Sequence, residues 1–271
     1  MIFCVGNGES RKNFDLHKLK PFGKVYGCNG LYRDFTPDVL VAMDYNICHE
    51  IYRSGYAFEN PVYLKEWQKN PASMYDKLFY PETVTKFIGN VNPHEYTDEW
   101  VWKGEDKKFF VCWANNVDML RKFREENTEW HEDDFKLHFG EDQEGYTITW
   151  TKKKDKVMGL GKYQQEKTNA GVLIALMAAD VSNKVYLVGY DYKSKTKKVN
   201  NIYKGTKGYV GPKAQAIDPD NWIYHTKRLL NKYEKHEFIH VGDNIKELDE
   251  RDNWTNISYE ELDERINNKQ I

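Results

Sequence analysis

The sequence is poor in cysteine: it has four cysteines in 271 residues, with no Cys-x-x-Cys pair and no histidines at zinc-binding spacing. This excludes the usual signatures of a zinc site and of a disulfide framework. Cys4, Cys28 and Cys112 lie inside apolar runs, which is typical of buried thiols in a reducing compartment. No run of 18 apolar residues occurs, so we expect no membrane span, and no signal peptide is apparent. We therefore expect a cytoplasmic protein.

Two phosphate-binding motifs are also missing. No Gly-Lys-Ser/Thr string follows an apolar run, which excludes a P-loop. The turn Gly6-Asn7-Gly8 lacks the third glycine of a dinucleotide fingerprint, because Arg11 stands at that position. Asn29 stands where a ribose-binding acid is expected. The sequence therefore disfavours an NAD enzyme.

Short apolar runs predict a parallel β-sheet. Hydrophobic residues make up 40% of the chain and aromatic residues 15%, which is enough to build a core. Strands are predicted over 2–5, 24–28, 39–43, 108–113, 146–151, 184–188 and 237–241. A helix-like run follows the first strand and ends at residue 19, and further helices are predicted over 46–52, 168–179, 218–233 and 260–267. The alternation predicts an α/β fold, with a Rossmann-like, mainly parallel sheet and helices on both faces.

The middle of the chain predicts less regular structure. We expect an irregular, aromatic-rich insertion over about 54–104, with one short strand near 85–88. The acidic stretch 127–142 is predicted to be mostly solvated. The predicted organisation is therefore one Rossmann-like domain over 1–245, which contains the insertion, and a C-terminal helical tail over 246–271.

Glycines and polar residues at the ends of the first strands mark a candidate ligand site. Gly6 and Gly8 let the backbone approach a phosphate or a sugar, and the start of the following helix favours an anion. Asn29 and Asp44 end the next two strands, at the edge where open α/β sheets bind ligands. A structural strand–helix turn is the alternative for the glycines, and a helix cap is the alternative for Asp44.

The start of the chain resembles nucleotide-sugar glycosyltransferases. Val5-Gly6-Asn7-Gly8-Glu9-Ser10, with Asn29 closing the next strand, is similar to the start of bacterial CMP-sialic-acid sialyltransferases. It is also similar to the motility-accessory-factor glycosyltransferases, in which a Pro-Asp pair precedes a strand and an aspartate, as Pro37-Asp38 precedes Asp44 here. This part of the resemblance covers roughly residues 1–45.

The second half continues the resemblance over roughly residues 165–245. Thr168-Asn169-Ala170-Gly171 heads an alanine-rich helix, and a strand ending in Gly189-Tyr190-Asp191 follows, in the order of those families. The resemblance implies a nucleotide-sugar donor and no metal or other cofactor. The donor-binding residues that it implies are Gly6, Asn7, Gly8, Ser10, Asn29, Thr168, Asn169, Gly171 and Asp191.

The same resemblance places catalytic groups in the loop that follows the Gly-x-Asp strand. Tyr192 and Tyr203 are the tyrosines that would steady the departing phosphate, and Lys193 stands closest to the families' first tyrosine. A lysine can neutralise such a phosphate by its charge. No histidine occurs between 208 and 218, where those families have their catalytic histidine. With Asp44 as the candidate base, the mechanism would be direct displacement at the anomeric carbon.

The loop over 192–217 is strongly basic. It contains seven lysines and no Asp or Glu, with tyrosines and glycines between them, although the chain as a whole has a net charge of −2. Such a loop could be a mobile lid, a grip on a polyanionic acceptor, or a solvated loop. The candidate polyanion-binding lysines are Lys195, Lys197, Lys198, Lys204 and Lys207. The acceptor candidates are a hydroxylated base in viral (phage) DNA, a glycan and a protein.

Two other hypotheses stay open. The Gly-Asn-Gly scaffold also resembles pterin pyrophosphokinase-like proteins, which would transfer pyrophosphate from ATP and need a metal. Asp218-Pro219-Asp220 spells a string by which some glycosyltransferases hold a metal, but its place at a helix start favours a cap. The third hypothesis is a non-catalytic nucleotide- or nucleic-acid-binding module. A requirement for a metal separates the pyrophosphokinase from the glycosyltransferase, and turnover separates both enzymes from the non-catalytic module.

Overall fold

The computed structural model describes residues 1–65 and 154–271, together with the strand segments 78–79, 99–103, 109–114, 135–141 and 146–152. It divides into two compact units, one formed by Met1–Val41 with Gly161–Ile271 and the other by Ala42–Leu160. The first unit carries the candidate site. No helix among the described residues is long and apolar enough to cross a membrane.

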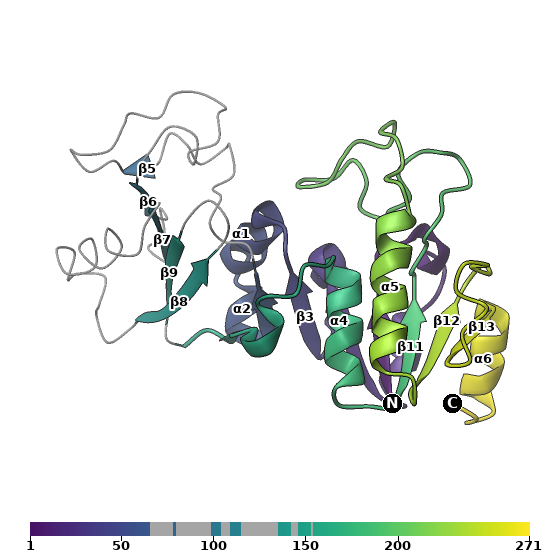
Figure 1. The fold of residues 1–271 in the computed structure, drawn as a ribbon. Helices are drawn as coiled ribbons and strands as arrows, with labels where there is room; N and C mark the ends of the chain where they lie inside the picture. Colours follow the sequence, from purple (N-terminus) through teal and green to yellow (C-terminus); the bar gives the residue numbers. More distant parts are fainter. Residues whose placement is uncertain (66–77, 80–98, 104–108, 115–134, 142–145, 153) are drawn as a thin grey trace. The chain divides into compact units, whose positions relative to one another are not determined.

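An eight-stranded, all-parallel sheet is the centre of the fold (Figure 1). Its strand order is β10 (Val157–Met158), β4 (Val62–Leu64), β3 (Val39–Ala42), β2 (Lys24–Cys28), β1 (Ile2–Val5), β11 (Lys184–Val188), β12 (Glu237–Val241) and β13 (Trp254–Ile257). The predicted α/β fold with a mainly parallel sheet is confirmed. From β3 to β13, the sheet has the 3-2-1-4-5-6 order of doubly wound nucleotide-binding folds.

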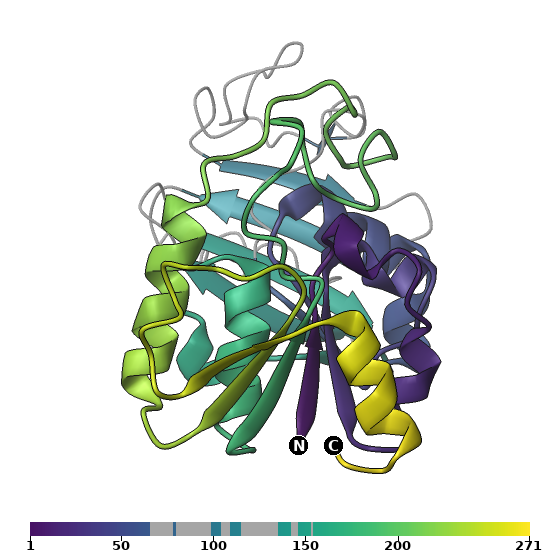
Figure 2. The same ribbon diagram turned by 90° about the vertical axis from the view of Figure 1, so that its right-hand side faces the viewer.

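Helices cover both faces of the sheet in the first unit, as predicted. α4 (Ala170–Ala179) and α5 (Asp220–Lys232) lie on one face, and α6 (Tyr259–Asn267) lies on the other (Figure 2). Nine of the ten residues of α4 are buried, because it packs on β1, β2 and β11 and against α5. This packing explains why the sequence of α4 is apolar on all sides.

Short 3₁₀ helices replace the longer helix expected after the first strand. The helix-like run there forms η1 (Glu9–Arg11) and η2 (Leu16–Leu19), and η3 (Asn29–Arg33) follows β2. A further 3₁₀ turn, η7 (Gly161–Tyr163), precedes α4. The segment 246–271, predicted as a helical tail, supplies β13 as well as α6, and β13 pairs in parallel with β12.

The second unit contains a second sheet. Two of its strands agree within a residue with the predicted strands 108–113 and 146–151, but the sequence did not predict that they form a separate sheet. The helices of the second unit include α1 (Tyr45–Arg53) and α2 (Tyr56–Glu59). Its antiparallel strands have the order β5 (Leu78–Phe79), β6 (Glu99–Lys103), β7 (Phe109–Ala114), β9 (Tyr146–Lys152) and β8 (Phe135–Glu141).

Strand β8 lies within the acidic stretch 127–142, where the sequence predicted no strand. Residues 135–141 pair with β9 along their whole length. Phe135, Leu137 and Phe139 alternate with polar residues, which is a strand pattern, but the acidic residues on both sides conceal it. The short strand expected near 85–88 lies outside the described residues.

The turn after β1 passes very close to the turn after β11. The N–H of Gly6 donates to the carbonyl of Val188 at 2.8 Å, and a Cβ on Gly6 would lie 2.5 Å from the carbonyl oxygen of Gly189. Because the clash is with backbone, we expect Gly6→Ala to lower the free energy of unfolding by about 1–3 kcal/mol in urea denaturation. In the matched control Gly211→Ala, the new Cβ meets nothing within 4 Å. Equal stabilities of the two variants would contradict this packing.

Candidate functional site

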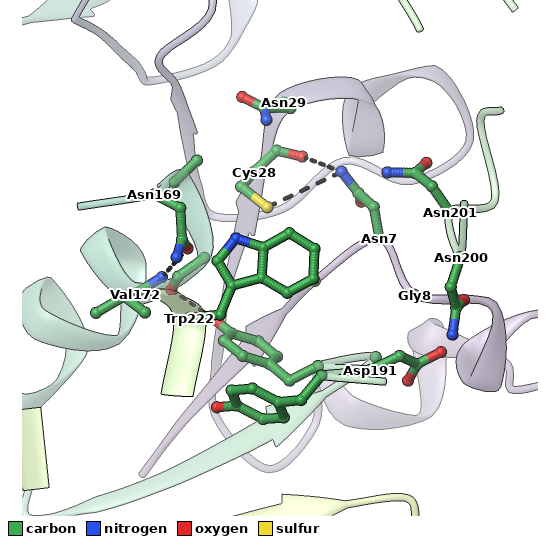
Figure 3. A pocket seen from close by; sticks show the side chains of 16 residues that line it. Asn7, Gly8, Cys28, Asn29, Asn169, Val172, Asp191, Asn200, Asn201 and Trp222 are labelled. Carbon is green, nitrogen blue, oxygen red and sulfur yellow. Dashed lines mark hydrogen bonds between the residues drawn. The ribbon is translucent and has the colours of Figure 1, made fainter. Parts of the chain in front are cut away.

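A cleft of about 180 Å³ lies at the carboxyl edge of the sheet (Figure 3). Its walls come from the residues that follow β1, β2 and β11, from the start of α4, from the first turn of α5 and from the loop between β11 and α5. The strand order reverses between β1 and β11. Open α/β sheets bind their ligands at such a switch point, outside the carboxyl ends of the strands.

Amide side chains dominate the lining of this cleft. Five asparagines line it: Asn7, Asn29, Asn169, Asn200 and Asn201. Trp222 supplies an indole ring, and the charged lining residue is Asp191 (Figure 3). Amides both donate and accept hydrogen bonds, so this lining suits the edge of a base or the hydroxyls of a sugar better than it suits a bare anion.

The short helix after the glycine turn does not offer its N-terminus to a ligand. The N–H of Ser10 donates to Asp191 Oδ2 at 2.8 Å, and the N–H of Glu9 donates to Asn200 Oδ1 at 2.8 Å. The Ser10 hydroxyl also donates to Asp191. The protein's own carboxylate therefore occupies the place where we expected a bound anion.

Donors without a partner gather instead at the start of α4. Asn169 is the N-cap of α4, and its Oδ1 accepts from the N–H of Val172 at 2.9 Å. Its Nδ2 is buried and has no hydrogen-bond partner among the described residues. The N–H groups of Ala170 and Gly171 lie in the first helical turn, where helix geometry provides no partner, and both residues line the cleft. A ligand acceptor oxygen would satisfy these donors.

Two contacts hold Asn7 in its orientation. Its Nδ2 donates to the carbonyl of Cys28 at 3.1 Å, and its Oδ1 accepts from Arg11 Nη2 at 3.4 Å. Asn29, which also lines the cleft, has a left-handed backbone with φ of 49°, a conformation that asparagine tolerates better than most residues. The two neighbouring strands thus each present one amide at the cleft.

A buried guanidinium connects the glycine turn to the basic loop. Arg11 is only 3% exposed. Its Nε donates to the carbonyl of Gly6 at 2.7 Å, and its Nη2 donates to the Tyr203 hydroxyl at 3.0 Å. The Tyr203 hydroxyl in turn donates to Asp34, whose carboxylate lies 3.9 Å from Arg11 Nη1. Arg11 thus joins η1, η3 and the loop.

A second arginine holds the outer part of the same loop. The Arg33 guanidinium lies 5.6 Å from the ring centroid of Tyr203 and 5.3 Å from that of Tyr209. It donates to the Thr206 hydroxyl and to the carbonyl of Lys207, each at 2.7 Å. The N–H of Gly30 also donates to the Tyr209 hydroxyl at 2.8 Å. The segment predicted as a lid is therefore docked on η3 in this structure.

Of the four predicted catalytic residues, only Tyr192 lines the cleft. Burial raises the pKa of its phenol, and its hydroxyl lies 3.0 Å from that of Thr226. Tyr203 is engaged by Arg11 and Asp34, and Lys193 forms an ion pair with Glu247. Asp44 belongs to the second unit, where it is the exposed N-cap of α1.

Seven of the nine predicted donor-binding residues line the cleft: Gly6, Asn7, Gly8, Asn29, Asn169, Gly171 and Asp191. Ser10 and Thr168 do not line it. The lining residues that the prediction missed are Cys28, Ala170, Val172, Gly189, Tyr190, Asn200, Asn201 and Trp222. The sequence contained one signal for Trp222. This residue lies three positions after Pro219, in the first turn of the helix predicted to follow the basic loop.

The described residues contain no cluster of three or more His, Cys, Asp or Glu side chains that could hold a metal ion. In the string Asp218-Pro219-Asp220, the Asp218 carboxylate accepts from the N–H of Asp220 at 2.9 Å at the start of α5.

The chain matches no protein-family model, no curated protein and no solved structure. The function must therefore be argued from the geometry of the cleft.

Removing the Arg11 guanidinium should destabilise the fold. We expect Arg11→Met to lower the free energy of unfolding by about 2–4 kcal/mol, because the buried partners of a charged group lose their hydrogen bonds. The matched control is Arg265→Met on α6, where the arginine is partly exposed and pairs with Glu261 one turn away at 2.7 Å. Such a pair contributes less than about 1 kcal/mol. The free energies of unfolding are measured by urea denaturation. If the two variants lose similar amounts, Arg11 contributes no more to stability than an exposed ion pair does.

Proposed function

We propose that this protein is a glycosyltransferase that binds a nucleotide-sugar in the amide-lined cleft. The observation that carries the proposal is the position of the cleft, at the point where the strand order reverses between β1 and β11. Doubly wound sheets bind nucleotides at this point. The polar but largely uncharged lining adds support, because a nucleoside and a sugar present many hydrogen-bonding groups and flat apolar faces.

Each part of the cleft has a role in this proposal. The asparagine amides bind the base edge and the ribose hydroxyls, and the Trp222 indole packs on a ring face. The donors at the start of α4, including Asn169 Nδ2, receive phosphate oxygens, where the helix dipole also favours negative charge. The cleft thus holds the donor by hydrogen bonds rather than by cations.

The transfer itself is a direct displacement. An acceptor hydroxyl oxygen bonds to the anomeric carbon while the bond from that carbon to the phosphate oxygen breaks. The nucleotide leaves with the electron pair, and a base takes the hydroxyl proton. Asp191, the carboxylate in the cleft lining, already accepts hydrogen bonds from Ser10.

A nucleotide-binding module without catalysis is the second candidate. The observation that favours it is the engagement of the predicted catalytic side chains. Lys193 pairs with Glu247, and Tyr203 is bound by Arg11 and Asp34. These groups would have to leave their partners to act on a departing phosphate.

A ligand screen tests the donor site, and turnover then separates the two candidates. We expect CMP, UDP, GDP or ADP, or one of their sugars, to raise the thermal unfolding midpoint. At about 100 times its dissociation constant, a ligand adds roughly 2.7 kcal/mol of stability. If no nucleotide shifts the midpoint, the donor-site assignment is wrong. If one binds but is never cleaved in the presence of candidate acceptors, the module without catalysis is the better description.

Asn169 offers a sharper test, because its two amide atoms have separate roles. Asn169→Asp keeps the oxygen that caps α4 but replaces the Nδ2 donor with a second acceptor. We expect at least about a tenfold weaker affinity for the nucleotide identified in the screen, measured on folded protein, while the cap of α4 is kept because an aspartate is also a good N-cap. Asn268→Asp, at the exposed end of α6, makes the same chemical change elsewhere. Unchanged affinity of the Asn169 variant would remove α4 from the binding site.

A further inference from the structure

The seven lysines of the basic loop fall into two groups. Three form ion pairs: Lys193 with Glu247, Lys195 with Asp243 and Lys204 with Glu9. Four are exposed and form no ion pair with the described residues: Lys197, Lys198, Lys207 and Lys213. Of the five lysines predicted to bind a polyanion, two therefore already have carboxylate partners, and Lys213 joins the remaining three.

The four unpaired lysines belong to a hydrogen-bonded projection. Lys198 forms an antiparallel bridge with Gln215, flanked by hydrogen bonds from Val199 N–H to the Ala214 carbonyl and from Ala216 N–H to the Lys197 carbonyl, each at 3.0 Å. Lys207 lies in a turn that is closed by the N–H of Gly205, which donates to the Val210 carbonyl at 2.7 Å. The loop rises above the carboxyl edge of β11 (Figures 1 and 2).

The same projection forms part of the cleft. The N–H of Ile202 donates to the carbonyl of Asn7 at 2.9 Å, and the adjacent Asn200 and Asn201 line the cleft. The cationic surface and the candidate donor site therefore share one loop. A macromolecule bound by the lysines would lie beside the cleft entrance.

The tyrosines of the loop do not form a stacking platform for bases. Tyr192 and Tyr203 are buried, at 4% and 6% exposed. Tyr209 contacts Arg33 with its ring and accepts from Gly30 through its hydroxyl. Single-stranded nucleic acids are usually held by stacked aromatic rings, whereas lysines alone contact phosphates. The surface therefore suits a duplex, whose bases are already stacked and whose phosphates face outward.

We propose that Lys197, Lys198, Lys207 and Lys213 bind the phosphodiester backbone of duplex DNA. The inference that this DNA is also the sugar acceptor rests on the proposed function, but the binding itself does not. Charge complementarity carries the proposal: four exposed cations lie on one projection of a chain whose net charge is −2. Attraction to DNA must then come from this local surface and not from the protein as a whole.

The salt dependence of binding tests the proposal quantitatively. The full chain is titrated onto a fluorescently labelled 20-base-pair duplex, without nucleotide, between about 50 and 200 mM salt. Each neutralised phosphate contributes about −0.9 to the slope of log K against log salt, so four contacts predict a slope of about −3.6. Lys197→Gln with Lys198→Gln should weaken binding and reduce the slope to about −1.8.

The control removes two lysines that are also exposed, at the opposite edge of the sheet. Lys24 opens β2 and Lys235 precedes β12, so Lys24→Gln with Lys235→Gln makes the same change in net charge at the amino ends of the strands. We expect affinity and slope to be those of the unmodified protein. Equal effects of the two double variants would show that only net charge matters, and would overturn the proposal.

Three other results would also overturn it. One is no binding to the duplex at about 50 mM salt. Another is tighter binding to the single strand of the same sequence, and the third is equally tight binding to polyglutamate of matched charge. Because nucleotide is absent from these titrations, a failed donor screen and a failed DNA titration are separate outcomes. A protein that binds duplex DNA but no nucleotide would keep this surface and lose the proposed function.

Discussion

The contacts of the buried Arg11 guanidinium hold the candidate site together. A charged group at 3% exposure is tolerated only when its donors are satisfied, because the cost of removing it from water is otherwise several kcal/mol. Gly6, Asn7, Tyr203 and Asp34 supply acceptors on the strand turn, the basic loop and η3. One side chain thus fixes the glycine turn, the orientation of a lining amide and the root of the loop.

This arrangement changes how the cleft can hold a ligand. In a dinucleotide fingerprint, a glycine at the Arg11 position lets the helix pack closely and the helix N-terminus receives the pyrophosphate. Here the following helix is a single 3₁₀ turn whose N–H groups bind Asp191 and Asn200. The donors without partners lie across the cleft at Asn169, on α4. The strand order from β3 to β13 is that of doubly wound sheets, but the donors without partners lie at the start of α4 and not at the helix after the glycine turn.

The sequence predicted the elements whose signals are local. Buried parallel strands are short continuous apolar runs, so β1, β11 and β12 were predicted within a residue, and α4 was predicted with the correct end but with a start two residues early. β13 was missed because Trp254–Ile257 has polar residues at its centre. Asn7 and Asn29 follow the ends of predicted strands and were found for the same reason, although Cys28 and Tyr190, also at strand ends, were not. Asn200 and Trp222 depend on how a long loop folds back. The ion pairs of the loop join residues about 50 or more positions apart, and no sequence pattern specifies them.

The two groups of lysines also differ in what they do for the loop. Exposed ion pairs contribute about 0–1 kcal/mol each, so the three paired lysines add little, and the contacts of Arg11 and Arg33 hold the loop in place. The four lysines that form no ion pair with the described residues contribute even less to the fold. Like charges gathered on one small projection repel one another, and this repulsion opposes folding slightly. When a polyanion binds, these lysines are attracted to its phosphates, and this attraction outweighs their mutual repulsion. The lysines that slightly destabilise the isolated protein are therefore the ones best suited to bind a phosphate backbone.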